Sequence, residues 1–147
     1  MKRARIGIIA TAVLAVATMA FAQAKPDFSG SWALEADPAA AAGGGGGRGG
    51  GPLTVKQTAT ELSVERAGRG GGAPTTTVYK LDGSETKVTM GQNEGTATAK
   101  WEGSKLVIST KAGEFATTAT WSLEGGVLTI DSTGGRGPTK RTYKKTT

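Results

Sequence analysis

The stretch GTATAKWEGSKLVISTKAGEFATTATWSLEGGVLTIDS, residues 95–132, decides the fold, because its apolar and polar residues alternate. Residues of one parity are mostly apolar or small, and we expect these to face inward: Ala97, Ala99, Trp101, Leu106, Ile108, Phe115, Thr117, Ala119, Trp121, Leu123, Leu128 and Ile130. This period-two pattern is typical of half-buried strands. Turn residues at 102–103 and 124–126 separate the strands. The stretch therefore predicts two consecutive β-hairpins.

Shorter segments on both sides continue the same pattern. The first strand should carry Trp32 inward, and the last, residues 139–145, places Arg141 and Tyr143 on one face. Residues 78–81 and 86–90 should pair across Asp82-Gly83, because both turn positions accept positive φ. We expect about ten strands and no helix after the N-terminal segment. The fold class is all-β, an antiparallel up-and-down meander that forms a barrel or a sandwich.

The N-terminal segment has the three parts of a secretory signal peptide. Cationic residues come first, an apolar run over 6–22 follows, and Ala22-Gln23-Ala24 matches a small-x-small cleavage site. We predict that residues 1–24 are removed before Lys25 and that residues 25–147 form one exported domain, periplasmic or extracellular. The alternative is an uncleaved membrane anchor, because the run is near the length of a spanning helix.

The composition argues against several functional classes. The chain has no cysteine and no histidine, which removes the thiol nucleophile, the usual general base and most zinc or copper sites. Its carboxylates show no paired spacing, so we expect no catalytic residue, no metal site, no cofactor and no enzyme activity. Without the three cations of the signal, the formal charge falls from +6 to +3. A nucleic-acid partner is therefore not expected.

Glycine-rich connections distinguish the two ends of the predicted meander. Residues 39–51 are low-complexity and predicted to be disordered. The tight connections are expected at 59–60, 82–83, 102–103 and 124–126, and the longer ones at 39–52, 67–74, 91–94, 111–114 and 133–138. Because connections alternate between ends, Arg48, Arg69 and Arg136 should gather at the long-loop end, where they would bind an anion. The alternative is that these arginines only solubilise flexible loops.

The predicted interior contains small residues beside large ones. Ala97, Ala99, Thr117 and Ala119 face inward. Four larger side chains are expected nearby: Tyr79, Met90, Trp101 and Trp121. Small residues inside a barrel of about ten strands leave a cavity for a ligand. The alternative is a filled core in which tryptophans occupy the space beside the alanines. The candidate ligand-binding residues are thus Tyr79, Trp101 and Trp121, together with Arg48, Arg69 and Arg136.

The sequence Asp27-Phe28-Ser29-Gly30-Ser31-Trp32 resembles the Gly-x-Trp start of lipocalin-like proteins. This resemblance implies a closed barrel in which Trp32 lies at the closed end, under a basic residue of the last strand. Arg141 is the position similar to that basic residue, so the structural residues are Gly30, Trp32 and Arg141. The mature chain also resembles small exported bacterial proteins with the same opening and a basic Tyr-Lys-Lys ending. Ten strands are closer to the fatty-acid-binding branch, although its helical lid is missing.

Three functions compete at this point. The first is a secreted, non-enzymatic, monomeric barrel that binds a small amphipathic or acidic ligand. The second is a structural or surface-interaction β protein with a filled core and no small-molecule ligand. The third is a hydrolase that uses carboxylates. An outer-membrane barrel is disfavoured, because outward residues such as Thr96, Thr98 and Lys100 are polar and unsuited to lipid.

Overall fold

The protein is a single ten-stranded antiparallel sheet wound into a nearly closed barrel. The computed structural model describes residues 24–36, 51–68, 71–90, 92–135 and 137–146. The strands are β1 (Gly30–Ala36), β2 (Leu53–Gln57), β3 (Glu61–Arg66), β4 (Thr75–Lys80), β5 (Thr86–Met90), β6 (Asn93–Glu102), β7 (Lys105–Ala112), β8 (Phe115–Glu124), β9 (Val127–Gly134) and β10 (Thr139–Thr146). The predicted all-β meander is confirmed. The predicted signal peptide and disordered loop lie outside the described residues, apart from Ala24 and Gly51.

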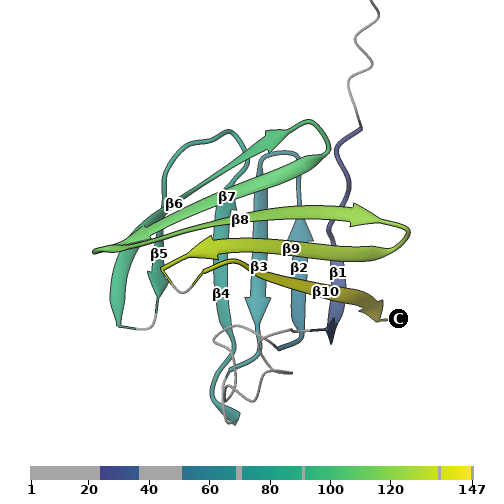
Figure 1. Ribbon diagram of the computed structural model, residues 1–147, viewed down its shortest axis with the longest axis horizontal. Helices are drawn as coiled ribbons and strands as arrows, with labels where there is room; N and C mark the ends of the chain where they lie inside the picture. Colours follow the sequence, from purple (N-terminus) through teal and green to yellow (C-terminus); the bar gives the residue numbers. More distant parts are fainter. Residues whose placement is uncertain (1–23, 37–50, 69–70, 91, 136, 147) are drawn as a thin grey trace, which may run out of the picture.

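The first and last strands close the barrel by pairing with each other. Trp32 lies opposite Lys145 and Leu34 opposite Tyr143 in the β1–β10 ladder. The sheet order is β4-β3-β2-β1-β10-β9-β8-β7-β6-β5. Strands β8 to β10 cross in front of β1 to β4, so that two walls face each other across the interior (Figure 1). The predicted pairing of the Trp32 and Tyr143 strands is therefore confirmed.

The sheet is interrupted between β4 and β5, the two strands at the ends of its order. The prediction that residues 78–81 pair with residues 86–90 is wrong. The Asp82 carboxylate accepts a hydrogen bond from the Ser84 amide at 2.8 Å, and this local turn widens the connection. One edge amide, that of Lys80, instead donates to the Thr86 hydroxyl at 3.4 Å. Near this turn, β4 and β5 are therefore connected by a hydrogen bond to a side chain and not by a ladder of backbone hydrogen bonds.

Two connections are shorter than the sequence suggested. We expected longer links at residues 91–94 and 111–114, but β6 begins at Asn93 and β7 continues to Ala112. The β7–β8 turn contains Gly113 at φ +60°, a conformation that glycine adopts without strain and that allows a two-residue turn. The contrast between tight and long connections therefore holds only in part.

Alternation along the strands correctly predicts most of the core. The largest fully buried side chains are Trp32, Trp121, Tyr143, Phe28, Leu53, Leu62, Leu106, Leu128, Val55 and Val64. Two expectations are wrong: Phe115 is 67% exposed and Met90 is 42% exposed. Both occupy inward-parity positions at a strand end, where no opposite wall covers them. Parity therefore predicts the direction of a side chain but not whether the barrel reaches far enough to bury it.

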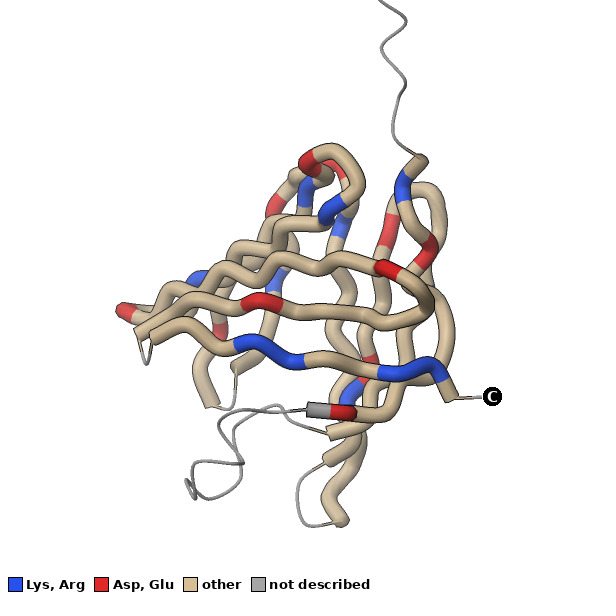
Figure 2. The backbone as a smooth tube through the Cα atoms, turned by 45° about the vertical axis from the view of Figure 1, so that its right-hand side comes forward, with Lys and Arg blue, Asp and Glu red and all other residues tan. Residues whose placement is uncertain are grey.

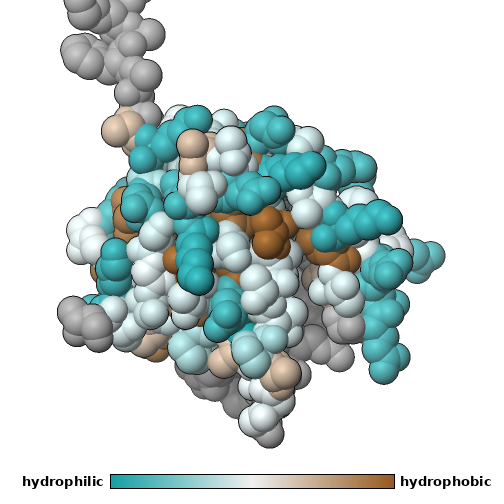
Figure 3. Space-filling model, turned by 180° about the vertical axis from the view of Figure 1, so that it is seen from behind, coloured by the Kyte–Doolittle hydropathy of each residue, from teal (hydrophilic) through white to brown (hydrophobic). Residues whose placement is uncertain are grey.

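The outer surface on the back of the molecule is mainly polar. Viewed from behind, it consists mostly of hydrophilic or neutral residues with small apolar areas between them (Figure 3). Among the described residues, no helix is long and apolar enough to span a membrane.

Candidate functional site

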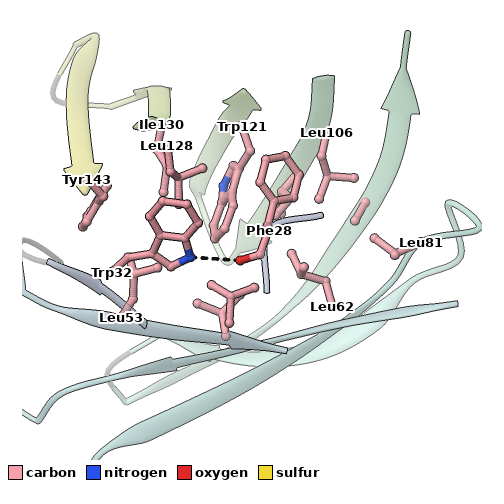
Figure 4. Close-up of a cluster of buried hydrophobic side chains, with 14 residues drawn as sticks. Phe28, Trp32, Leu53, Leu62, Leu81, Leu106, Trp121, Leu128, Ile130 and Tyr143 are labelled. Atoms are coloured by element: carbon pink, nitrogen blue, oxygen red, sulfur yellow. Dashed lines mark hydrogen bonds between the residues drawn. The ribbon is translucent and has the colours of Figure 1, made fainter. Parts of the chain in front are cut away.

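An N-terminal plug, residues Lys25–Ser29, closes one end of the barrel with an aromatic side chain. Phe28 is completely buried. Its ring lies parallel to that of Trp101 at a centroid distance of 5.8 Å and meets Trp121 edge-on at 5.7 Å. Figure 4 shows Phe28 beside Trp121 and Leu106, inside the cluster of buried side chains. Such ring pairs add stabilisation beyond their buried area, so the plug is part of the core.

Hydrogen bonds from β2 hold the plug backbone in place. The Gln57 side chain accepts from the Phe28 amide at 3.0 Å and donates to the Pro26 carbonyl at 3.1 Å. The Gln57 amide donates to the Ser29 hydroxyl at 3.0 Å. Hydrogen bonds from the Ser29 side chain and backbone lower the pKa of Asp27. The plug is therefore fixed through its backbone as well as through the Phe28 ring.

Trp32 connects the plug to the last strand. Its indole nitrogen donates to the Phe28 carbonyl at 2.9 Å, as the dashed line in Figure 4 marks. The Lys145 amine lies 5.7 Å from the centre of the Trp32 ring. The sequence suggested Arg141 for this cation, but the β1–β10 register places Lys145 opposite Trp32. A Cβ at Gly30 would lie 2.5 Å from Lys145 Cε, and Gly30 has φ +136°, so glycine is needed for this approach.

We expect Lys145→Met to lower the free energy of unfolding only slightly. A cation over an indole contributes about 0.5–1 kcal/mol at an exposed site, and methionine keeps most of the apolar stem. The change should appear as a small shift of the urea midpoint in chemical denaturation. A loss of several kcal/mol would show that Lys145 has a larger role in closing the barrel.

The half of the barrel away from the plug, here called the open half, has a different inner face. Register places several half-buried small or hydroxyl residues there on the same face as the core: Thr77, Thr110, Thr117, Ala119 and Ser132. Their partial exposure means that solvent reaches this part of the inner face. Ala97 and Ala99, by contrast, are buried. The interior is thus filled around the plug, and beside β7 to β9 it combines half-buried positions with the buried Ile108, Ala112 and Ile130.

Two arginines belong to the inner face of the open half. Arg66 lies opposite the buried Leu53, and Arg141 lies opposite the buried Ile130, two residues before the buried Tyr143. Paired residues share a face, so both arginines face the interior. Both are half-buried. Each lies toward the end of its strand that is farther from the plug, and the basic positions of β10 appear in blue along its length in Figure 2.

Tyr79 lies on β4, the strand paired with the β3 strand that carries Arg66, and on the same inner face. Burial raises the pKa of Tyr79, and the positive charge of Arg66 partly opposes this effect. In the β3–β4 ladder, Tyr79 lies opposite Leu62. The Tyr79 hydroxyl is therefore kept neutral over a wider pH range than a free tyrosine.

The raised pKa of Tyr79 predicts a loss of stability at alkaline pH. In the unfolded chain Tyr79 ionises near pH 10, whereas in the folded chain it stays protonated to higher pH. Ionisation above about pH 10 therefore favours the unfolded state. Tyr79→Phe should lose less stability than the wild type between pH 8 and about pH 11, measured by urea denaturation. Equal losses in the two proteins would contradict this assignment.

Of the six ligand-binding residues that the sequence suggested, the structure describes Tyr79, Trp101 and Trp121. Arg48, Arg69 and Arg136 lie outside the described residues. Trp101 and Trp121 contact Phe28, and Trp121 is only 2% exposed. The two arginines on the inner face were missed as ligand-binding candidates. The sequence pattern did indicate that they face inward. Arg66 has the same strand parity as Leu62 and Val64, and Arg141 has the same parity as Tyr143.

A separate hollow of about 430 Å³ lies on the outer side of the β3–β4 connection. Its described lining is Pro52, Thr54, Glu65, Ala67, Gly68, Gly71, Gly72 and Pro74. Glu65 is the only charged residue among these described lining residues. Nor do any three acidic side chains within the described ranges gather as metal ligands.

Comparisons with known proteins identify the same barrel in solved structures. No protein-family model matches the chain, and no curated protein does. The fatty-acid-binding protein 1 of Echinococcus granulosus superimposes with a TM-score of 0.65 at 17% identity, over 82% of this chain and 98% of that protein. The REP1-NXSQ fatty acid transporter gives 0.64 at 17% identity, over 81% and 96%.

A third similar structure is a secretory abundant heat soluble protein of Ramazzottius varieornatus. Its TM-score is 0.65 at 14% identity, over 84% of this chain and 98% of that one. At these identities the similarity establishes the fold alone. The lipocalin-like barrel that the resemblance implied is therefore confirmed as a fold, and the fold is what these structures share with the chain.

Proposed function

We propose that the protein is an exported, non-enzymatic barrel that binds a small amphipathic acid in its open half. One observation carries the proposal: Arg66 and Arg141 face the interior, half-buried, beside small and hydroxyl-bearing residues. Arginine is well suited to this role, because its planar guanidinium can bind a carboxylate through two parallel hydrogen bonds.

The inner surroundings favour an amphipathic ligand over a simple anion. Thr110 and Thr117 face each other across β7 and β8, and Ile108 lies opposite Ala119 in the same ladder. The hydroxyls offer polar contacts near the open end, whereas the half-buried Ala119, backed by the buried Ile108, offers apolar surface nearer the plug. A ligand with an acidic head toward the opening and a short apolar tail toward the plug matches both.

The solved structures of similar fold support this class of ligand. Two of them are named for fatty acids, the Echinococcus granulosus binding protein and the REP1-NXSQ transporter. None of the names cited above describes a catalyst, which is in line with a binding role. Arg48, Arg69 and Arg136 remain further candidates, because the connections that carry them join strands at the end opposite the plug.

A structural protein with a filled core is the second candidate function. The observation that favours it is the dense packing of Phe28, Trp32 and Trp121 at the closed end. These described side chains leave no space for a ligand there. A protein of the same fold is named for heat solubility rather than for a ligand. In this alternative the open half serves no binding purpose.

Calorimetric titration with octanoate and with 1-octanol distinguishes the two functions. The binding proposal expects octanoate to bind more tightly than the alcohol, because only the acid can pair with the arginines. Raising the salt from a low concentration to about 0.15 M should weaken octanoate binding only modestly, because partly buried charges are screened less than exposed ones. Equal affinity for acid and alcohol, or no binding of either, would favour the structural alternative.

Export is a separate part of the proposal and has its own test. Mass spectrometry of protein recovered from the extracytoplasmic fraction should give the mass of a chain that begins at Lys25. A chain that retains residues 1–24 would contradict cleavage at the predicted site.

A further inference from the structure

We infer that Phe28 limits the length of the ligand, so that the barrel selects acids with a short tail of about eight carbons. The inference rests on the proposed function and specifies its ligand class. Phe28 is then a specificity-determining residue, although Phe28 belongs to neither of the two facing walls.

The position of Phe28 is the first support for this role. The plug enters from the N-terminus, and its ring occupies the space between Trp101 and Trp121. Together with the ring, Leu62 and Leu106 are completely buried. A tail that enters from the open half would therefore meet the Phe28 ring and not a continuous channel.

The change of exposure along β8 locates the point where the accessible interior ends. Thr117 and Ala119 are half-buried, whereas Trp121, two residues further and in contact with Phe28, is almost inaccessible. The accessible part of this strand thus runs from Phe115 at the rim to Ala119.

Strand geometry converts this span into a ligand length. Four residues of a strand cover about 13 Å, or about 10 Å along the axis of a barrel whose strands tilt by about 40°. An extended alkyl chain with C–C bonds of about 1.5 Å advances roughly 1.3 Å per carbon. The accessible stretch of β8 between the rim and Phe28 therefore matches the length of a tail of about eight carbons.

The plug is held firmly enough to form a fixed end to the space that the ligand tail can enter. The Gln57 side chain bonds to the Phe28 amide and to the Pro26 carbonyl, and the Trp32 indole donates to the Phe28 carbonyl. The Lys25 amine also lies 5.6 Å from the centre of the Trp101 ring. A longer tail would have to displace these contacts, whereas a shorter one leaves them intact.

The test is a calorimetric series of hexanoate, octanoate, decanoate and dodecanoate on the wild type and Phe28→Ala. In the wild type, affinity should rise about fourfold per methylene up to about eight carbons and then level off. In Phe28→Ala the rise should continue, so that dodecanoate binds about tenfold or more tightly than it does to the wild type. Hexanoate affinity should be nearly equal in the two proteins.

Two further variants keep the test decisive. Phe28→Leu removes less volume and should extend the limit by fewer carbons if Phe28→Ala is too unstable to purify. Phe115→Ala makes the same change in an exposed ring at the opposite rim, and its length limit should equal that of the wild type.

The outcomes separate the inference from the proposed function. A wild-type affinity that keeps rising through dodecanoate, or a limit unchanged in both Phe28 variants, would overturn the inference and leave the acid-binding function standing. Failure of every acid to bind the wild type would overturn both.

Discussion

Trp32→Ala is expected to lower the free energy of unfolding by about 3–5 kcal/mol, the range for truncating a large buried aromatic side chain. Trp32 is buried in the first strand, its indole bonds to the Phe28 carbonyl, and its neighbour across the ladder is Lys145. The substitution thus removes packing, a buried hydrogen bond and a ring contact at the place where the barrel closes. For a domain with a typical stability of about 5–15 kcal/mol, this loss threatens folding.

Urea denaturation followed by tryptophan emission measures this effect, with Trp101→Ala as a partner variant. Trp101 is only partly buried, although it stacks on the same Phe28 ring. Its truncation should therefore cost less than that of Trp32. Trp32→Phe should recover part of the loss because it restores volume without the indole donor. If Trp32→Ala costs less than about 1 kcal/mol, barrel closure does not depend on this residue.

The second large effect is expected on binding. Replacing Arg66 and Arg141 together by glutamine should weaken octanoate binding about 100-fold. A hydrogen bond to a charged group contributes about 1.5–3 kcal/mol, and each 1.4 kcal/mol corresponds to about tenfold in affinity. Binding of 1-octanol should change little, because glutamine keeps polarity and removes only the charge. The difference in affinity between octanoate and 1-octanol, measured by calorimetry, should therefore disappear in the double variant.

The loop arginines offer a matched control. Replacing Arg48, Arg69 and Arg136 by serine removes one more positive charge than the double variant does. If Arg66 and Arg141 bind the acidic head, the loop variant should keep its preference for acid over alcohol, with only a modest loss at low salt. If the loop variant loses the preference for acid over alcohol while the double variant keeps it, the acidic head group of the ligand binds to the loop arginines.

The sequence predicted the barrel well because period-two alternation is a local property with a global consequence. Once Trp101, Trp121 and Leu128 share one face, each neighbouring strand must pair in the register that keeps that face inward. Pairing of the two terminal strands then follows from the even number of strands. The interruption between β4 and β5 did not follow, because the Asp-Gly signal is local and the Asp82–Ser84 turn competes with it.

The site was harder to predict, for two physical reasons. Phe28 lies before the first strand, in a segment without alternation, so nothing in the pattern indicates that it crosses into the interior. Arg66 has inward parity, but a charged residue at a strand end is usually solvated, and only the structure shows it half-buried on the same inner face as the partly buried Tyr79. The motif at residues 27–32 did contain the aromatic residue of the plug, Phe28, four residues before Trp32.

The most direct test of the account is to map octanoate binding by NMR amide shifts in labelled protein. We expect the largest changes at inward-facing residues of the open half, Arg66, Thr117, Ala119 and Arg141. Thr98 and Thr118, on the outer face of the same wall, should be almost unaffected. Changes confined to the outer face or the loops, or no change at saturating octanoate, would contradict a ligand site inside this barrel.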